Sequence, residues 1–361
     1  MAEELDPADY LSRHWQTGGT GIQQKVDELI EMSAGKSDNA SLYRDMILDV
    51  IRMAQADRNR WDAKIMLQTI RELEQAFARL ELFKRRRKVT VFGSARTPAG
   101  SPIYLLARDM GAMLSRHDYM TITGAGGGIM AAAHQGAGLD NSLGFNITLP
   151  FEQRSNDVVH NTDHDLPFKF FFLRKLFFVK EADALILCPG GFGTLDETLE
   201  VLTLIQTGKS PMVPIVLLDV AEGTYWEGLL QFFREQLSEH GYIHESDFNL
   251  MKLAHSPAEA MQEVLTFYSN YHSARWSQGR YLLRMHRPLT QQAMADIHRD
   301  FAALSRDGSF SQHGCATGEE EPELCNLARL SFPFNGRDHG QLRALIDVLN
   351  REENQENRGT A

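Results

Sequence analysis

The spacing of hydrophobic residues changes along this chain and divides it into three parts. Short apolar runs, typical of strands that are buried on both faces of a sheet, occur between about residues 88 and 270. They are residues 89–92, 119–123, 143–149, 184–188 and 213–218. Helical segments alternate with these runs. The middle part is therefore predicted to be an α/β domain with a doubly wound, Rossmann-like parallel sheet.

Helical spacing dominates residues 1–87, which we expect to form a helical N-terminal extension. Residues 1–40 are polar and broken by glycines, as in a flexible or loosely helical segment, with one short helical pattern at 26–32. Apolar residues then recur at intervals of three and four between 41 and 83, which predicts two helices. Such a stripe of methionine and aromatic side chains indicates packing rather than a cofactor site.

Residues 271–361 are predicted to form a small C-terminal extension. The pattern indicates a helix over 294–304, a strand over 328–334 and another helix over 340–349, followed by a polar tail of the kind found in disordered segments. No chemistry is recognisable there.

A glycine-rich turn with the sequence P-G-G-F-G-T-L-D-E occupies residues 189–197, directly after the strand predicted at 184–188. Gly190, Gly191 and Gly193 lack the Cβ atom that would block close approach of a ligand to the backbone. The N–H groups in the first turn of the following helix would face an anion placed there. The turn is therefore predicted to hold a phosphate group.

Glu197 has two competing interpretations on this motif alone. Thr194 and Glu197 match the S/T-x-x-E capping box, in which both side chains satisfy backbone N–H groups at a helix start. A purely structural carboxylate is as well supported as a functional one.

Arg174 and Lys175 lie in the middle of residues 166–180, a segment that is apolar around nearly its whole circumference if it is helical. Such cations are rarely buried without a partner. Each is therefore expected to pair with a protein carboxylate or with a ligand phosphate, and the segment alone does not distinguish the two.

A second glycine-rich turn, residues 124–128, follows the strand predicted at 119–123. The G-x-G-x-x-G dinucleotide fingerprint fails when counted from Gly124 and survives only in a looser form from Gly126, so a tight turn is an equal interpretation. No P-loop motif is present. Ser94 follows the strand at 89–92, and ligands bind at the carboxyl ends of such strands, so we expect one shared crevice.

Four segments, 93–96, 123–133, 174–175 and 189–197, together resemble the LOG family of cytokinin riboside 5′-monophosphate phosphoribohydrolases. Some relatives have carried the label lysine decarboxylase. The resemblance covers about residues 88–270 and implies hydrolysis of nucleoside 5′-monophosphates to free base and ribose 5-phosphate. It implies Arg174 and Glu197 as the catalytic pair, and a homodimer or larger assembly.

The resemblance also implies a set of substrate contacts. Asn156 is preferred over Glu152 and Gln153 as the ribose contact. The substrate-binding residues expected are Ser94, Gly126, Gly127, Gly128, Asn156, Lys175, Gly190, Gly191, Gly193, Thr194 and Thr203. The base is expected to be a purine, with or without an N6 substituent, and the family also includes AMP nucleosidase-like activity.

Two other functions compete with hydrolysis. A pyridoxal-phosphate decarboxylase would need a Schiff-base lysine and a partner for the pyridinium nitrogen, and Lys175 has no obvious partner of this kind, so no cofactor is expected. A non-catalytic carrier of nucleotides or of the molybdenum cofactor would use the same phosphate turn. The presence of both Arg174 and Glu197 favours the enzyme.

Composition restricts the kinds of partner and the cellular location that can be expected. The formal net charge of −11 argues against general nucleic-acid binding, and the basic run at residues 84–88 is interpreted as the solvated end of a helix. No apolar run approaches the ~20 residues that span a bilayer. The acidic start lacks the apolar region of a signal peptide, so we expect a cytoplasmic protein. Cys188, Cys315 and Cys325 indicate neither a disulfide framework nor, with His313, a metal site.

Overall fold

The computed structural model describes residues 20–57, 59–148, 154–315 and 322–356. It divides into two compact units, residues 1–71 and 72–361. The division predicted above, into 1–87, 88–270 and 271–361, stays a prediction.

The first unit is helical. It contains α2 (Thr20–Ala34), α3 (Ala40–Gln55) and the first half of α4 (Arg60–Leu80). Val26, Ile30 and Leu48 form a small buried cluster between α2 and α3. The two helices predicted between residues 41 and 83 are confirmed, and the short pattern at 26–32 is part of a helix of 15 residues.

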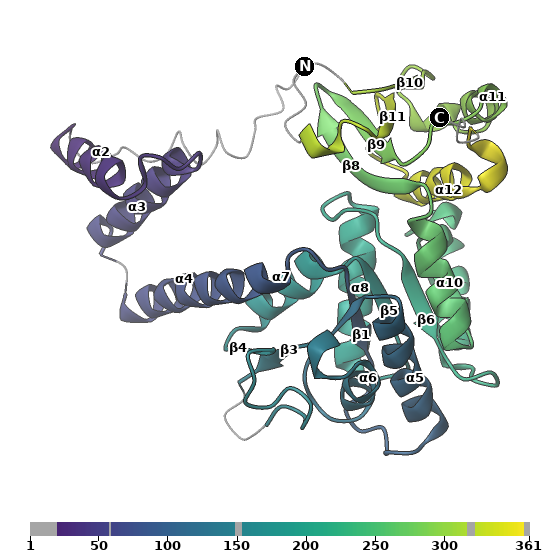
Figure 1. Ribbon diagram of the computed structural model, residues 1–361, viewed down its shortest axis with the longest axis horizontal. Coiled ribbons are helices and arrows are strands. Elements are labelled where there is room, and N and C mark those ends of the chain that lie inside the picture. Colours follow the sequence, from purple (N-terminus) through teal and green to yellow (C-terminus); the bar gives the residue numbers. More distant parts are fainter. Residues whose placement is uncertain (1–19, 58, 149–153, 316–321, 357–361) are drawn as a thin grey trace. The chain divides into compact units, whose positions relative to one another are not determined.

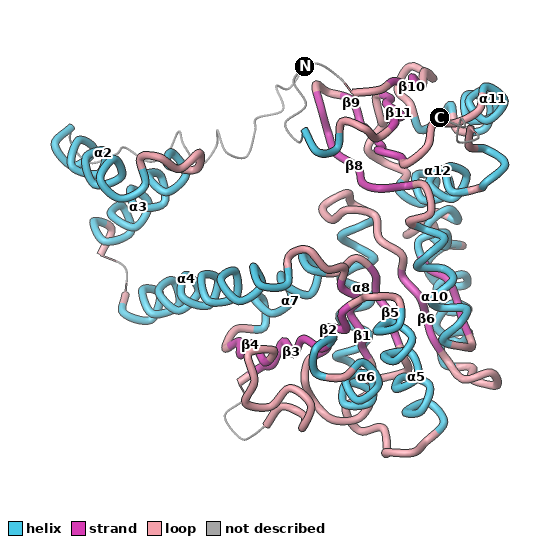
Figure 2. The backbone as a smooth tube through the Cα atoms, in the orientation of Figure 1, coloured by secondary structure: helices cyan, strands magenta, loops and turns pink. Residues whose placement is uncertain are grey.

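The second unit contains a parallel sheet of seven strands in the order β4-β3-β2-β1-β5-β6-β7 (Figures 1 and 2). All five predicted strands are present in it, which confirms the doubly wound α/β fold. The edge strands β4 and β7 were not predicted. The strands are β1 (Lys88–Phe92), β2 (Met120–Thr123), β3 (Ser142–Ile147), β4 (Asp165–Phe168), β5 (Ala184–Leu187), β6 (Ile215–Leu218) and β7 (Met251–Ala254).

Alternate side chains of the central strands bury opposite faces of this sheet. Val89 and Val91 of β1 pack with residues of α5 (Pro102–Arg116), α6 (Ile129–Ala137) and α10 (Pro257–Phe267). Phe92 belongs to the other face, with residues of α7 (Phe171–Glu181), α8 (Phe192–Gln206) and α9 (Tyr225–Phe232). Because both faces are covered, the central strands are mostly buried, and apolar residues predominate in the short runs that predicted them.

The apolar segment at residues 166–180 forms two elements instead of one helix. Its first residues belong to β4, and α7 begins at Phe171. Pro167 suits an edge strand, where its missing N–H group costs little. The turn is held by Glu72 of α4, whose carboxylate accepts hydrogen bonds from the N–H groups of Lys169 (3.1 Å) and Phe170 (3.4 Å). Because the segment is apolar around nearly its whole circumference, its spacing shows no period that could reveal this break.

A second sheet, antiparallel and in the order β10-β11-β9-β8, lies in the C-terminal part of this unit. The predicted helix, strand and helix are confirmed, although the first helix ends at Asp300; the hairpin β8–β9 was not predicted. Arg343 is buried and pairs with Glu263 of α10, which joins this part to the core. The elements are β8 (Tyr271–Ser277), β9 (Arg280–Met285), β10 (Ser311–His313), β11 (Ala328–Phe332), α11 (Gln291–Asp300) and α12 (His339–Asn350).

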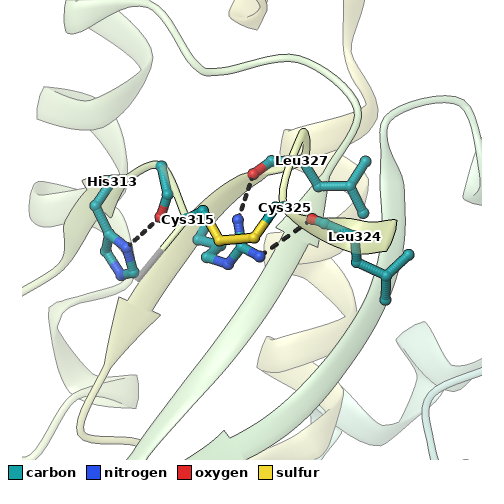
Figure 3. Close-up of a disulfide and its surroundings, with 7 residues drawn as sticks. His313, Cys315, Leu324, Cys325 and Leu327 are labelled. Atoms are coloured by element: carbon teal, nitrogen blue, oxygen red, sulfur yellow. Dashed lines mark hydrogen bonds between the residues drawn. A yellow bond between two sulfur atoms is a disulfide. The ribbon is translucent and has the colours of Figure 1, made fainter. Parts of the chain in front are cut away.

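Cys315 and Cys325 form a disulfide (Figure 3), although the odd count of three cysteines was interpreted as indicating no disulfide framework. β10 and β11 pair in antiparallel register, with His313 opposite Arg329, and this pairing brings the two cysteines together. The Arg329 side chain donates to the carbonyls of Leu324 (3.1 Å) and Leu327 (2.6 Å) beside the bridge. The two cysteines are ten residues apart in the sequence, and this spacing does not indicate a disulfide unless the pairing of β10 with β11 is known. Cys188 is free and buried.

In the described part of the chain, no helix has both the length and the apolar composition that crossing a bilayer requires.

Candidate active site

A cleft of about 550 Å³ opens at the carboxyl ends of β1 and β5. These strands are neighbours in the sheet (Figure 1), but the chain leaves β1 toward α5 on one face and leaves β5 toward α8 on the other. A crevice at such a switch point is the usual ligand site of a doubly wound sheet. Its lining residues are Phe92, Gly93, Ser94, Ala95, Arg96, Gly124, Met130, Ile147, Arg174, Phe178, Gly191, Phe192, Gly193, Thr194 and Glu197.

The start of α8 forms one wall of the cleft. Its N-cap is Gly191, so the helix begins before Thr194, and no side chain caps it. Of the two interpretations of Glu197, the capping box with Thr194 is excluded: Thr194 is already inside the helix, where its N–H group bonds to the carbonyl of Gly191 (3.0 Å). Space is open beside Gly191 and Gly193. The uncapped first turn leaves backbone N–H groups for an anion, as the phosphate prediction requires.

The loop after β1 connects both glycine-rich turns. The N–H group of Ser94 donates to the carbonyl of Pro189 (3.2 Å), and the Ser94 carbonyl accepts from Ile129 at the start of α6 (3.0 Å). A Cβ atom at Gly128 would lie 2.2 Å from the Ser94 carbonyl oxygen, and φ there is +59°, so glycine is required for this approach. The turn at residues 124–128 thus supports the cleft.

Arg174 reaches the cleft from α7. Its Nη1 atom lies 3.6 Å from the position that a Cβ atom would take at Gly124, and its guanidinium lies 5.0 Å from the ring centroid of Phe171 and 5.6 Å from that of Phe178. The buried Nε has no hydrogen-bond partner among the described residues. Burial lowers the pKa of Arg174, and the neighbouring Glu197 carboxylate opposes this shift. A buried donor without a protein acceptor is available to a ligand.

Glu197 projects from the second turn of α8 and is only 4% exposed. Burial raises its pKa to about 7, against the opposing charges of Lys175 and Arg174, while Glu200 and Asp196 raise it further. Its Oε2 atom is buried without a hydrogen-bond partner in the described part of the chain. A carboxyl group with a pKa near neutrality, facing a cleft, is suited to accept a proton.

Lys175 turns away from the cleft and contacts the carboxylates of α8. Its Nζ atom lies 2.8 Å from Asp196, 2.7 Å from Glu200 and 3.5 Å from Oε1 of Glu197. These partners raise the pKa of the Lys175 ammonium above its usual value, although burial opposes them. The sequence left Lys175 to pair with either a protein carboxylate or a ligand phosphate, and the structure shows the pairing with protein carboxylates.

The structure brings Ser94, Arg174, Gly191, Gly193, Thr194 and Glu197 together along the cleft. Gly190 lies behind it, and its carbonyl accepts a hydrogen bond from the hydroxyl of Tyr225 (2.8 Å). The exposed Thr203 bonds to the Leu199 carbonyl on α8 and does not line the cleft. Glu152 and Gln153 lie outside the described residues.

Asn156 and the turn at residues 126–128 do not line the cleft either. The Asn156 amide donates to the Gly126 carbonyl (3.2 Å) and contacts Nδ1 of His134 (3.1 Å). His134 is fully buried, which lowers its pKa to about 4, so this histidine is neutral near pH 7. These bonds fix the turn behind the β1 loop.

Sequence reasoning missed the apolar wall of the cleft, formed by Phe92, Met130, Ile147 and Phe178. Phe178 lies one helical turn after Arg174, so the helical spacing of α7 could have indicated it. Nothing in the sequence could have indicated Met130 and Ile147, because their residue types and spacing are those of ordinary core residues. Arg96 and the 93% exposed Phe192 also line the opening.

A family model described as "Possible lysine decarboxylase" matches residues 127–264. The chain is 39% identical over 99 residues to the "Probable cytokinin riboside 5′-monophosphate phosphoribohydrolase LOGL2" of Oryza sativa subsp. japonica, a match that covers 27% of this chain and 38% of that protein. It is 38% identical over 91 residues to the corresponding enzyme LOG1 of Arabidopsis thaliana, covering 25% and 41%. The resemblance of the core to the LOG family is confirmed. The chain spans about two fifths of the length of these relatives.

Solved structures with similarity to the chain include the molybdenum cofactor binding protein of Rippkaea orientalis. The two are 22% identical with a TM-score of 0.36, over 49% of this chain and 94% of that chain. DNA processing protein A of Helicobacter pylori is 12% identical with a TM-score of 0.36, over 51% and 83%.

Proposed function

We propose that this protein hydrolyses the N-glycosidic bond of nucleoside 5′-monophosphates and releases the free base and ribose 5-phosphate. One observation carries the proposal: the buried carboxylate of Glu197 and the half-buried guanidinium of Arg174 face the same cleft beside an uncapped helix start. Among the described residues, Oε2 of Glu197 and Nε of Arg174 are buried without a hydrogen-bond partner. The similarity to the LOG enzymes supports the same reaction.

The 5′-phosphate would bind at the start of α8. The open space at Gly191 and Gly193 admits a phosphate close to the backbone, and the helix dipole favours its charge. Binding energy gained at the phosphate, away from the reacting bond, would position the ribose so that C1′ lies near Glu197. Arg174 would hold the phosphate or the ribose hydroxyls through its planar set of donors.

Glu197 would act on the attacking water. The bond between C1′ and the base nitrogen breaks, its electron pair leaves with the base, and positive charge develops on the ribose. The ionised carboxylate stabilises this charge and accepts a proton from the water as the water oxygen bonds to C1′. The leaving base takes up one proton and Glu197 releases the proton that it accepted, so one water is consumed without a net change in protons.

The apolar wall would take the base. Phe92, Phe178 and Met130 offer planar and polarisable surfaces of the kind that contact a purine ring. AMP, other nucleoside monophosphates and N6-prenylated AMP are the substrates to compare. The base preference and a place in cytokinin biosynthesis follow from that comparison.

A homodimer or larger assembly is part of this proposal. The neighbouring helices α7 and α8 expose large apolar side chains, namely Phe171, Phe172, Leu176 and Leu199, between 46% and 54% exposed. Exposed apolar patches of this kind indicate a contact surface. Light scattering at micromolar concentration measures the assembly directly, and a monomeric mass would refute it. The cytoplasmic location stays a prediction, since the disulfide is a feature typical of oxidising compartments.

The reaction can be tested by chromatography of the purified protein with a panel of nucleoside 5′-monophosphates that includes AMP and its N6-isopentenyl form. Free base and ribose 5-phosphate are expected from the parent protein and from Glu227→Gln, a matched change at an exposed site on α9. Glu197→Gln is expected to lose the activity. Nucleotide binding without base release by the parent protein would replace the hydrolase with a carrier or sensor.

A further inference from the structure

A second cavity, of about 630 Å³, lies where the strands of the same sheet begin, which we call the amino edge of the sheet. The carboxyl edge is the side on which these strands end. Arg87 directly precedes β1, Asp183 precedes β5 and Val213 precedes β6, so the cavity covers the amino ends of three strands. Residues of α7 and the first residues of β8 complete its wall. The cleft described above lies at the carboxyl ends of β1 and β5, so the two spaces are separate.

Positive groups line one side of this cavity. The basic run at residues 84–88 contributes Arg87, while Arg86 pairs with Asp118 (3.0 Å) and Lys88 with Glu181 (3.2 Å). The Arg87 guanidinium lies 3.9 Å above the centroid of the Tyr268 ring and has no hydrogen-bond acceptor among the described residues. Its N–H groups are therefore free for an acceptor in the cavity, because stacking uses the face of the group and leaves its edges open.

Two lysines add to this charge. Lys209 is exposed after the end of α8 and has no ion-pair partner among the described residues, and Lys180 pairs with Glu181. Asp183 is the one carboxylate in the lining, and its Oδ2 already accepts a hydrogen bond from the N–H group of Lys88 (2.8 Å). Three cations and one carboxylate line the cavity, so its lining carries a net positive charge. Arg87 lies close enough to Asp183 to oppose the rise of that carboxyl's pKa caused by burial, but neither Arg87 nor Lys209 forms a salt bridge with a described residue.

The other side of the cavity is apolar and fixed in place. The Tyr268 hydroxyl donates to the Asp183 carbonyl (2.7 Å), which holds its ring against Arg87. Tyr271, Met212 and Pro211 extend this surface. A volume between about 300 and 1,000 Å³, mostly apolar walls and a few directed polar groups are the usual features of a site for a small organic ligand.

We propose that this cavity binds a small organic phosphate of the nucleoside diphosphate class. The phosphates would contact Arg87 and Lys209, because a guanidinium edge and an ammonium group are the side-chain donors best suited to phosphate oxygens. The apolar part of the ligand would lie against Tyr271 and Met212. This inference does not depend on the proposed hydrolysis, since it uses none of the residues of the cleft.

The test is calorimetric titration of the full chain with ADP and, separately, with pyrophosphate. Arg174→Ala is included because it weakens anion binding in the cleft at the carboxyl edge. We expect ADP to bind Arg174→Ala still, and to bind it more tightly than pyrophosphate does, because pyrophosphate leaves the apolar wall unoccupied.

Arg87→Ala combined with Lys209→Ala is expected to weaken ADP binding by about tenfold or more, from the loss of charge-assisted hydrogen bonds. The matched control combines Arg116→Ala with Lys36→Ala, two exposed cations that do not line the cavity, and should bind ADP as the parent does. Thermal melting and elution volume confirm that each variant is folded. If Arg87→Ala disrupts folding, the exposed Lys209→Ala alone is expected to weaken binding by about threefold.

Three outcomes would overturn the proposal. They are loss of all ADP binding in Arg174→Ala, unchanged binding in the variant that lacks Arg87 and Lys209, and pyrophosphate binding as tight as that of ADP. The first two would assign ADP to the cleft alone, and the third would remove the role of the apolar wall.

Discussion

The two edges of the parallel sheet use the same strands, β1 and β5, but leave their charged groups in different states. At the carboxyl edge, Glu197 is buried and Arg174 half-buried, and each has a buried atom without a hydrogen-bond partner among the described residues. At the amino edge, Asp183 is hydrogen-bonded, Arg87 stacks on Tyr268 and Lys209 is exposed to solvent. Leaving a buried polar atom unpaired destabilises a fold. Other such atoms occur elsewhere in the structure, for example in Thr90 and His339, so the two at the carboxyl edge point to function only because they also face a cleft. This contrast is consistent with the two proposals above, hydrolysis at the carboxyl edge and ligand binding at the amino edge.

The strongest test of this contrast is Glu197→Gln. The amide keeps the shape of the carboxyl group but cannot accept a proton, so base release should fall by about 10²- to 10⁴-fold. ADP binding at the amino edge should be unchanged, because Glu197 does not line that cavity. Single-turnover assays and calorimetry measure the two effects on the same preparation. Base release at the parent rate would assign the carboxylate a structural role.

Arg174→Ala should have the next largest effect. Removing the guanidinium takes away a set of donors whose Nε has no acceptor among the described residues, so kcat/KM for nucleoside monophosphates should fall by about a hundredfold. The matched change Arg234→Ala, on the outer surface beyond α9, should leave kcat/KM within about twofold. Steady-state assays measure kcat/KM for both variants. Equal losses of kcat/KM in the two would mean that Arg174 does not contact the substrate in the cleft.

The pH dependence of activity follows from the raised pKa of Glu197. The carboxylate form is the proton acceptor, so kcat/KM should rise by about tenfold per pH unit below the pKa of about 7 and level off above it. Stability should change in the opposite direction. Because the pKa in the folded state lies above the usual value of 4.5, the folded protein binds more protons, and the free energy of unfolding should fall as pH rises from 4.5 through 7.

Denaturant titrations of the parent and of Glu197→Gln at a series of pH values separate this contribution from those of other groups. The difference between the two proteins should grow across the same pH window. A constant difference would place the pKa of Glu197 at its ordinary value.

Tyr225→Phe should have the smallest effect. It removes one hydrogen bond to the Gly190 carbonyl and leaves the ring in place, so the backbone of the phosphate turn becomes less fixed. The loss of about 0.5–1.5 kcal/mol should appear as a rise of about three- to tenfold in KM, with kcat little changed. Tyr242→Phe, at an exposed ring, is the control. A fall in kcat with constant KM would indicate that Tyr225 acts on the reacting bond.

Much of the core could be predicted because its elements are local in sequence. The five central strands are short apolar runs, and the helices of the N- and C-terminal parts have clear spacing. The edge strand β7, Met-Lys-Leu-Ala, is too short and too mixed to stand out, and the hairpin β8–β9 interrupts its apolar pattern with arginines at positions 275, 280 and 284. Element type was thus predictable where one face or both faces are uniformly buried.

The sequence by itself predicted a phosphate site, because the glycine turn is read from residue types and spacing. The roles of Arg174 and Glu197 as a catalytic pair were implied only by the resemblance to the LOG family, since spacing alone left each with a structural alternative. Only the tertiary structure decided between the alternatives. α8 begins at Phe192, so Glu197 is no helix cap, and Lys175 is paired within the protein. The apolar wall, the disulfide and the cavity at the amino edge are also tertiary features. Their residues are distant along the chain, and the packing that joins them leaves no local pattern in the sequence.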